Sequence, residues 1–276
     1  MNALQRLLYL PASRRNVVAT RAIIALHALW ILLSRWCLPN LLGWPEAFWS
    51  GVSDTTHLRY GWLSGVPERA LFIVLIVLLP FAIWSRAASL GSALLLYHFA
   101  PLEDAMIGWP GPYLRGLTVD VLALAILAFA PGIRSGPDPN FRWPVTLVRF
   151  AVAAQYTFST IGKLRTVGLE WFSAENIQDL ARLLQIVAAP PHPDAVIRHP
   201  ALALAIGAGW FILSISMIGA VVSRSTATVV VALVAIAHIA AAFLFGIVWL
   251  AAPLLLVFID FDQRATPNSS AQRASA

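Results

Sequence analysis

The chain has 276 residues, of which 59% are hydrophobic and 12% are charged, with a net charge of +6. Soluble domains carry about twice that charged fraction, and the apolar residues here come in long blocks, so the composition excludes an ordinary soluble domain and favours an integral membrane protein. The arginines are scattered singly between these blocks, which is typical of topology determinants and argues against a nucleic-acid surface.

Five apolar segments that precede Lys163 are candidates for membrane-spanning helices, which need about 20 mostly apolar residues. The third contains the acidic pair Glu103 and Asp104 and is therefore expected to be short or broken. After the fourth, a stretch rich in Pro and Gly breaks the chain. The five candidates are residues 17–38, 70–84, 89–106, 113–130 and 144–162.

The C-terminal part of the chain contains two further apolar blocks. Residues 201–222 form the sixth candidate span. The block 226–259 is too long for one crossing, and Gly246 and Pro253 divide it into a seventh span that holds His238 and a shorter eighth. The sequence therefore predicts an all-α fold, a polytopic bundle of about eight transmembrane helices. The third and last segments leave the number open between about seven and nine.

The long connection between the fifth and sixth spans contains an amphipathic segment. Ser173 is a suitable N-cap, and Glu175 lies in the first turn, where a carboxylate is favourable. The apolar positions that follow at helical spacing are Ile177, Leu180, Leu184 and Val187. This pattern predicts a helix near residues 174–188 that lies on the membrane surface.

Eight crossings with both termini in the cytoplasm produce a consistent charge pattern. Most arginines of the loops then fall on the cytoplasmic side, as the positive-inside rule requires, and most acidic residues fall on the opposite side together with Lys163. The N-terminus lacks a cleavable-signal pattern, so the first apolar block is interpreted as a retained helix. We expect a cytoplasmic segment 1–10, a single transmembrane domain 11–264 and a disordered tail 265–276.

Lys163 is the only lysine of the chain, and all the other basic residues are arginines. An ammonium can lose its proton when it is desolvated, whereas a guanidinium effectively cannot. On a helix, Tyr156, Ser159 and Lys163 share one face, which would hold a basic amine beside two hydroxyls at the edge of the membrane. The alternative is that Lys163 only snorkels from a helix end to the interface.

Other ionisable residues fall within the candidate spans, where a charge costs at least a few kcal/mol and needs a partner or a function. Arg21 and Asp120 form a buried structural ion pair or belong to a functional site, and both alternatives stay open. His27 is interpreted as a hydrogen-bonded packing residue, and Arg149 as an anchor that snorkels to the interface. The residues most suited to proton transfer near neutral pH are His98 and His238.

The sequence lacks the short motifs of several common enzyme classes. It contains no Walker-type loop and no GxGxxG, HExxH, GxSxG or CxxC motif. The histidines are dispersed, so no metal site is expected, and the single cysteine, Cys37, excludes an internal disulfide and a cysteine-based zinc or iron–sulfur site. No matched pair of broken helices indicates an inverted-repeat transporter.

The run Gln155-Tyr-Thr-Phe-Ser-Thr-Ile-Gly-Lys-Leu164, with Arg149 and Phe150 before it and Trp171 after it, resembles the signature stretch of the vitamin K-dependent gamma-carboxylase family. That family shares a horizontally transferred transmembrane (HTTM) domain with many bacterial membrane proteins. Its pattern at this place is an aromatic-rich helix, a small-residue turn, Lys-Leu, and a Trp several residues later.

Two other segments carry the same resemblance. Residues 17–24 are similar to the first helix of the family, in which an Arg is followed by apolar residues. Residues 237–245, which run on to Asp260, are similar to its late helix, with a His before a Phe-rich run. The resemblance covers residues 11–264 and implies an HTTM-like transmembrane domain of a bacterial inner membrane.

The resemblance also implies an activity. In the carboxylase, reduced vitamin K is oxygenated to an epoxide, which generates a base strong enough to remove the γ-proton of a peptide glutamate, and the carbanion then adds carbon dioxide. The catalytic lysine of the family lies in its Lys-Leu motif, so Lys163 would inherit that role. A neutral amine has to take the proton of the hydroquinone, and burial favours the neutral form.

Two features of the animal carboxylase have no counterpart in the sequence. Residues 128–134 lack the histidine that assists the base, and no large extramembrane region follows the last span to hold a protein substrate. The membrane core with its lysine is what the resemblance retains. We expect this core to handle a quinone or a lipid.

The leading hypothesis is therefore a gamma-carboxylase-like membrane protein with quinol-coupled oxygenation or carboxylation chemistry, a reduced quinone of the vitamin K or menaquinone type as cofactor, and Lys163 as base. The alternatives are a non-catalytic protein that binds a lipid, a quinone or a membrane partner, and a small-solute transporter. The bilayer is the expected partner, and no nucleic acid is expected. The expected site residues are Lys163, His98 and His238 as catalytic groups, with Tyr156, Ser159, Asp120 and Arg21 binding the cofactor or supporting the site.

Overall fold

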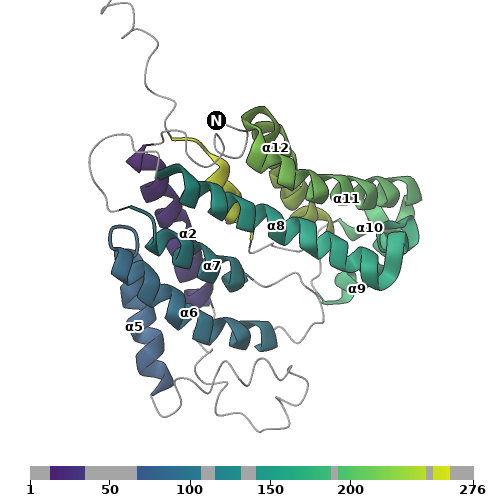
Figure 1. The fold of residues 1–276 in the computed structure, drawn as a ribbon. Coiled ribbons are helices and arrows are strands. Elements are labelled where there is room, and N and C mark those ends of the chain that lie inside the picture. The colour runs from purple at the N-terminus through teal and green to yellow at the C-terminus, as the bar shows by residue number, and fades with distance from the viewer. Residues whose placement is uncertain are drawn as a thin grey trace, which may run out of the picture.

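A computed structural model describes residues 13–34, 67–106, 116–131, 141–187, 192–246 and 251–261. All the regular elements in these ranges are helices (Figure 1), which confirms the predicted all-α class for the described residues. The predicted N-terminal segment 1–10 and C-terminal tail 265–276 lie outside them.

Most predicted spans correspond to one helix each, with ends that differ by a few residues. The predicted amphipathic segment is also helical, and the hydroxyl of Ser173 accepts a hydrogen bond from the backbone N–H of Asn176, 3.2 Å away, so its role as N-cap is confirmed. In chain order the α-helices are α2 (Arg14–Ser34), α5 (Glu68–Phe81), α6 (Arg86–Met106), α7 (Gly116–Ala128), α8 (Arg142–Val167), α9 (Ala174–Val187), α10 (Pro193–Arg198), α11 (Pro200–Val222) and α12 (Arg224–Phe245). The 3-10 helices are η5 (Gly168–Phe172) and η6 (Ala252–Phe258).

Three helices of the described part are long and apolar enough to cross a membrane, namely α2, α11 and α12. They have 21 to 23 residues, which at about 1.5 Å per residue corresponds to roughly 32–35 Å and matches the thickness of a hydrocarbon core. These helices support an integral membrane protein. The apolar part of α7, Leu117–Ala128, is shorter.

The third candidate span, which was expected to be short or broken, is the continuous helix α6. It packs against both α5 and α7, and its residues Leu96 and Phe99 are buried. The ring of Phe99 meets that of Phe72 from α5 edge to face, with 5.4 Å between the ring centroids. Apolar packing on two sides therefore stabilises the helix despite the polar residues near its end.

The predicted eighth span is not an α-helix of spanning length in the described residues. Helix α12 ends at Gly246, as predicted, but residues 252–258 form the 3-10 helix η6. Its seven residues cover only about 14 Å at a rise of ~2.0 Å per residue. Arg149 of α8, interpreted from the sequence as a snorkelling anchor, donates hydrogen bonds to the carbonyls of Val257 and Ile259 and fixes the end of η6.

The main apolar core lies between α2, α5, α6, α7 and the first half of α8, and extends to η6 and to parts of α11 and α12. A second, smaller cluster joins α9, α10, α11 and α12, with Ile177, Ala181 and Phe245 among its buried members. Figure 1 shows α8 running from the neighbourhood of α2 and α7 across the molecule to α9. Helices α11 and α12 contribute residues to both clusters and therefore connect them.

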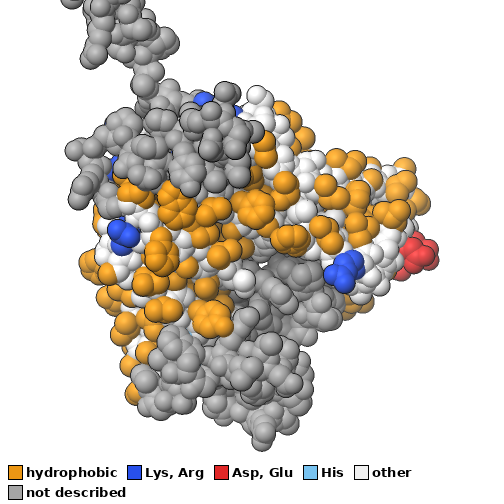
Figure 2. Space-filling model, in the orientation of Figure 1, with side chains coloured by type: hydrophobic (Ala, Val, Ile, Leu, Met, Phe, Trp, Pro, Cys, Tyr) orange, Lys and Arg blue, Asp and Glu red, His pale blue; other side chains and the backbone are white. Residues whose placement is uncertain are grey.

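Large apolar side chains cover much of the visible surface of the described residues (Figure 2). The exposed large apolar residues of α11 and α12 include Ile212, Ile236, Ile239 and Phe243, each more than half exposed. Contiguous apolar surface of this kind is rare on soluble monomers and agrees with helices that face lipid.

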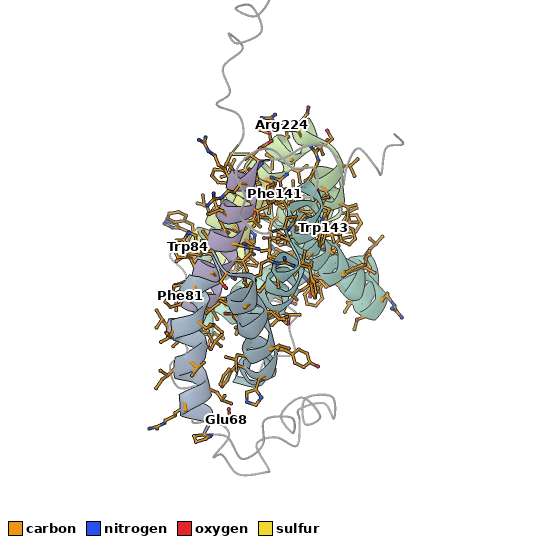
Figure 3. All side chains as sticks on the ribbon, turned by 60° about the vertical axis from the view of Figure 1, so that its left-hand side comes forward. Glu68, Phe81, Trp84, Phe141, Trp143 and Arg224 are labelled. Atoms are coloured by element: carbon orange, nitrogen blue, oxygen red, sulfur yellow. The ribbon has the colours of Figure 1, made fainter. Side chains whose placement is uncertain are left out.

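The two ends of the described chain are bonded to each other. Asn16 of α2 donates a hydrogen bond from Nδ2 to Oδ1 of Asp260 at 2.9 Å, and its Oδ1 accepts one from the backbone N–H of Phe261 at 2.8 Å. Figure 3 shows Arg224, at the start of α12, and Glu68, at the start of α5, at opposite ends of the molecule.

Gly207 of α11 lies against the backbone of η5. A Cβ atom added to Gly207 would meet the carbonyl oxygen of Phe172 at 2.3 Å, whereas one added to Gly209 would meet nothing within 4 Å. Backbone oxygens cannot move away as a flexible side chain does, so the close packing of η5 on α11 requires a glycine at position 207.

We predict that Gly207→Ala lowers the stability of the protein in detergent micelles by about 1–3 kcal/mol, because the new methyl group overpacks the contact with η5. Gly209→Ala is the matched control on the same helix, and it should be neutral or stabilise by up to about 1 kcal/mol, since alanine favours a helix over glycine. Thermal unfolding of both variants measures the difference. Equal midpoints would show that α11 and η5 do not approach as closely as described.

Candidate site at Lys163

Lys163 lies near the end of α8, where only 6% of its surface is exposed. The helix ends at Gly168, whose φ of 78° is a left-handed conformation that glycine adopts at little cost. The chain therefore turns back as η5, and Nζ of Lys163 lies 5.3 Å from the ring centroid of Trp171. An aromatic face at this distance attracts an ammonium, so Trp171 shields the amine and stabilises its charged form.

A cavity of about 240 Å³ adjoins Lys163 between α8, η5, α9, α11 and α12. Among the described residues that line it, Lys163 carries the only charge. The lining ranges from buried Phe172 and Phe245 to exposed Ala205, so the cavity reaches the surface beside α11. The site therefore combines one amine with walls that are otherwise aromatic or aliphatic.

Burial lowers the pKa of the Lys163 ammonium from its usual value of 10.5 to about 7. Lys163 follows the predicted span 144–162 directly and lies outside the three helices that are apolar enough to cross a membrane. The cause of the lowered pKa is desolvation, because the cavity walls replace the water that stabilises a positive charge. An amine with a pKa in this range is partly neutral near pH 7 and can accept a proton.

Tyr156 and His238 form a buried hydrogen-bonded pair between α8 and α12, with 2.8 Å between the phenol oxygen and Nε2. The ring of Trp210 contacts both, at centroid distances of 6.4 Å to Tyr156 and 5.4 Å to His238. Trp210 also lines the cavity beside Lys163. Trp210 therefore lies between the Tyr156–His238 pair and the cavity: it contacts the two rings of the pair and also lines the cavity.

Thr160 and Trp210 belong to this region and were missed by sequence reasoning. Thr160 is buried on the face of α8 that carries Tyr156 and Lys163, and its hydroxyl has no hydrogen-bond partner among the described residues. Its spacing from those two residues, at i+4 and i−3, was the available signal. The predicted Ser159 is partly exposed and does not line the cavity.

Asp120 lies in a different part of the molecule, bonded to His27. Its carboxylate oxygen Oδ2 is 2.8 Å from Nδ1 of His27, and both side chains are buried between α7 and α2. His27 is therefore the hydrogen-bonded packing residue that was expected. Neither residue lines the cavity at Lys163.

The structural ion pair considered between Arg21 and Asp120 is not formed. Arg21 instead donates a hydrogen bond from Nη2 to the backbone carbonyl of Leu127 at 2.7 Å. Leu127 follows Asp120 by seven residues, which is about 10 Å along α7. Because α2 runs past α7, His27 contacts Asp120, whereas Arg21 contacts the C-terminal end of α7 at Leu127.

His98 forms a third group with Glu68, whose Oε2 is 2.8 Å from Nε2 of the histidine. This contact joins α6 to the start of α5. His98 is buried and Glu68 is partly exposed. The partner was missed because Glu68 lies just before the predicted second span and was assigned to a loop.

The residues predicted to form one site thus lie in separate groups. Lys163 lines the cavity, and Tyr156 and His238 pair next to it across Trp210. Asp120 and His98 bond to other partners and do not line that cavity, and Arg21 lies at the end of α7. No cluster of three or more potential metal ligands occurs among the described residues.

Comparisons with protein-family models, with curated proteins and with solved structures gave no match to this chain. The chemistry of the site therefore rests on its own geometry. A single buried amine next to an apolar cavity can hold and deprotonate a weakly acidic group on an apolar molecule.

We predict that the contact between Tyr156 and His238 couples α8 to α12 by about 0.6–2 kcal/mol, the range of hydrogen bonds between membrane helices. In a double-mutant cycle, Tyr156→Phe and His238→Leu should each lower stability, and the double variant should lose less than the sum of both. Tyr97→Phe, at a tyrosine of α6 with 41% of its surface exposed, is the control. Strictly additive losses would contradict the coupling.

We also predict that the effect of Lys163→Met on stability depends on pH. Because the folded-state pKa of Lys163 is lowered to about 7, the unfolded chain binds more protons between that pH and about 10.5, and the stability of the wild type rises with pH across this window. Lys163→Met should therefore stabilise the protein most at or below pH 7 and progressively less toward pH 10. Arg165→Met, at an exposed position of the same helix, should show no such trend; thermal midpoints from pH 6 to 10 measure both.

Proposed function

We propose that this chain is an integral membrane protein that binds a reduced quinone, or a similar apolar phenol, in the cavity beside Lys163. The Lys163 amine would accept the proton of the ring hydroxyl. The observation that carries this proposal is the burial of the only lysine of the chain against an otherwise apolar cavity. A positive charge at this place costs stability, so the presence of a lysine here favours a chemical role.

The residues present fit such a ligand. Drug-sized ligands occupy pockets of roughly 300–1,000 Å³, and a cavity of about 240 Å³ is smaller. It has room for a ring system, whereas a long isoprenoid tail would leave beside α11, where Ala205 is exposed. Trp171 and Trp210 offer flat faces for an aromatic ring. Lys163 is positioned to meet the polar edge of that ring.

The chain's own residues account for one proton transfer. A bound hydroquinone would supply an acidic O–H group and the electrons for any later oxidation. The neutral amine of Lys163 takes that proton: the O–H bond breaks, an N–H bond forms on Nζ, and the bonding electrons stay on the oxygen. Trp171 stabilises the resulting ammonium through its ring face. The apolar walls exclude the water that would otherwise compete for the proton.

The gamma-carboxylase-like activity is part of the same proposal. The resemblance assigns the catalytic lysine of the family to Lys163, and the buried environment of this amine is what such a base needs. His238 and Tyr156 adjoin the site and are proposed to support it across Trp210. Asp120 and His98 have other partners and are left out.

We further propose about eight crossings of a bacterial inner membrane, with both termini in the cytoplasm, as the HTTM resemblance implies. The bonds between Asn16 and residues 260–261 support an even number of crossings, because they hold the two ends of the described chain together. The separation of Arg224 from Glu68 supports an arginine-rich side opposite an acidic one (Figure 3). The eighth crossing would be made by the segment that returns from the end of α12 toward Asn16, and η6 is part of that segment.

The test is binding and proton uptake with menadiol, a reduced naphthoquinone without a tail. The purified protein in micelles should bind it with quenching of tryptophan fluorescence, because two tryptophans line the cavity. Lys163→Met and Lys163→Arg should each weaken binding by about tenfold or more and abolish proton uptake. Arg keeps the charge but cannot act as a base.

Arg165→Met is the control for loss of a nearby positive charge and should bind like the wild type. Unchanged binding and proton uptake in Lys163→Arg would rule out the base. Binding without proton uptake in the wild type would favour the alternative, a non-catalytic protein that holds a quinone or lipid.

A further inference from the structure

Arg21 is the largest fully buried side chain of the described residues, with 0% of its surface exposed. Its Nη2 donates to the carbonyl of Leu127. Its Nε and Nη1 have no hydrogen-bond partner among the described residues. A buried guanidinium with two unsatisfied nitrogens is unusual, because the large majority of buried polar atoms are hydrogen-bonded.

A second guanidinium lies close to the first. Arg86, at the start of α6, donates from Nε to the carbonyl of Ala128 at 2.8 Å, the residue after Leu127. The two arginines are near enough for their charges to interact. Arg21 approaches the end of α7 from α2 and Arg86 from α6, so both positive charges meet at the C-terminus of one helix.

The described charges around this point do not balance. The C-terminus of a helix contributes roughly half a negative charge, against two positive ones. Asp120 of α7 is bonded to His27 and lies about 10 Å along the helix from Leu127. The acids of α6 follow Arg86 by at least 17 residues, about 26 Å along that helix. Among the described residues, the helix end therefore offsets only part of the charge of the buried Arg21, while the exposed Arg86 is hydrated.

An uncompensated buried charge with unsatisfied donors is strongly destabilising. We propose that Arg21 and Arg86 form an anion site at the C-terminal end of α7 that takes a phosphate group. A phosphate offers several strong acceptor oxygens and enough negative charge to match two guanidiniums. The carbonyl oxygens at a helix end carry only roughly half a negative charge and cannot match two guanidiniums. Arg86 is exposed and Arg21 is buried, so the phosphate would enter from the side of Arg86.

Two sources would provide this chemistry, the headgroup of an anionic membrane lipid and free inorganic phosphate. Both would be recognised by the same nitrogens. The site is independent of the function proposed for Lys163, which lies at a cavity that neither Arg21 nor Arg86 lines. Failure of either proposal would leave the other intact.

The test compares thermal unfolding of the full chain in nanodiscs of phosphatidylcholine with and without phosphatidylglycerol, and in micelles with sodium phosphate or sodium chloride at equal ionic strength. Phosphatidylglycerol, or phosphate, should raise the midpoint of the wild type by about 4 °C or more. Stabilisation by lipid but not by free phosphate identifies a headgroup site, and stabilisation by both identifies a general phosphate site.

Arg86→Gln and Arg21→Met should each reduce that stabilisation to about 1 °C or less. Arg182→Gln, at an exposed arginine of α9 that is bonded to Asp179, is the control and should keep it. If Arg21→Met does not fold, the exposed Arg86→Gln decides alone. Absence of stabilisation by either anion overturns the proposal. So does an Arg21→Met protein that is more stable than the wild type in every condition.

Discussion

The constraint on which this structure depends is the free-energy cost of leaving a polar group without a partner among apolar helices. Helix α2 meets α7 through His27 and Asp120, and α8 meets α12 through Tyr156 and His238. Both contacts join helices that are distant in the sequence, and both are buried. In a lipid environment, the hydrophobic effect does not favour one apolar helix face over another as the contact surface. These polar contacts therefore define which faces of the helices meet.

Much of the helical architecture was predictable, because it follows from local signals. Apolar blocks of spanning length, the hydroxyl of Ser173 and the glycine at position 246 mark helices and their ends without reference to the rest of the chain. The end of the last apolar block was predicted to be a short eighth span, but residues 252–258 form a 3-10 helix, which composition does not separate from a short α-helix. Its shape depends on hydrogen bonds from Arg149, which lies more than 100 positions earlier.

The candidate site was predictable only in part. Lys163 stood out because its residue type is unique in the chain, and the helical spacing of Tyr156 was visible beside it. The partner of Asp120 could not be predicted from the sequence, because both Arg21 and His27 of α2 were possible. Only the register in which α2 packs on α7 places His27, and not Arg21, next to Asp120. Trp210 and Gly207 lie in an apolar span whose sequence pattern does not distinguish a lipid-facing residue from one that lines a cavity. Such residues are found only once the helices have been packed.

The bonds of Asn16 to residues 260–261 also bear on how the molecule is made. The two partners are separated by 244 and 245 positions along the chain. At a synthesis rate of roughly 5–20 residues per second, the side chain of Asn16 waits about 12–50 s before its partner emerges. During that time η6 is absent too, so the faces of α2 and α8 that it covers are open. The nascent chain therefore has a late step, in which residues 252–261 close a structure begun by α2.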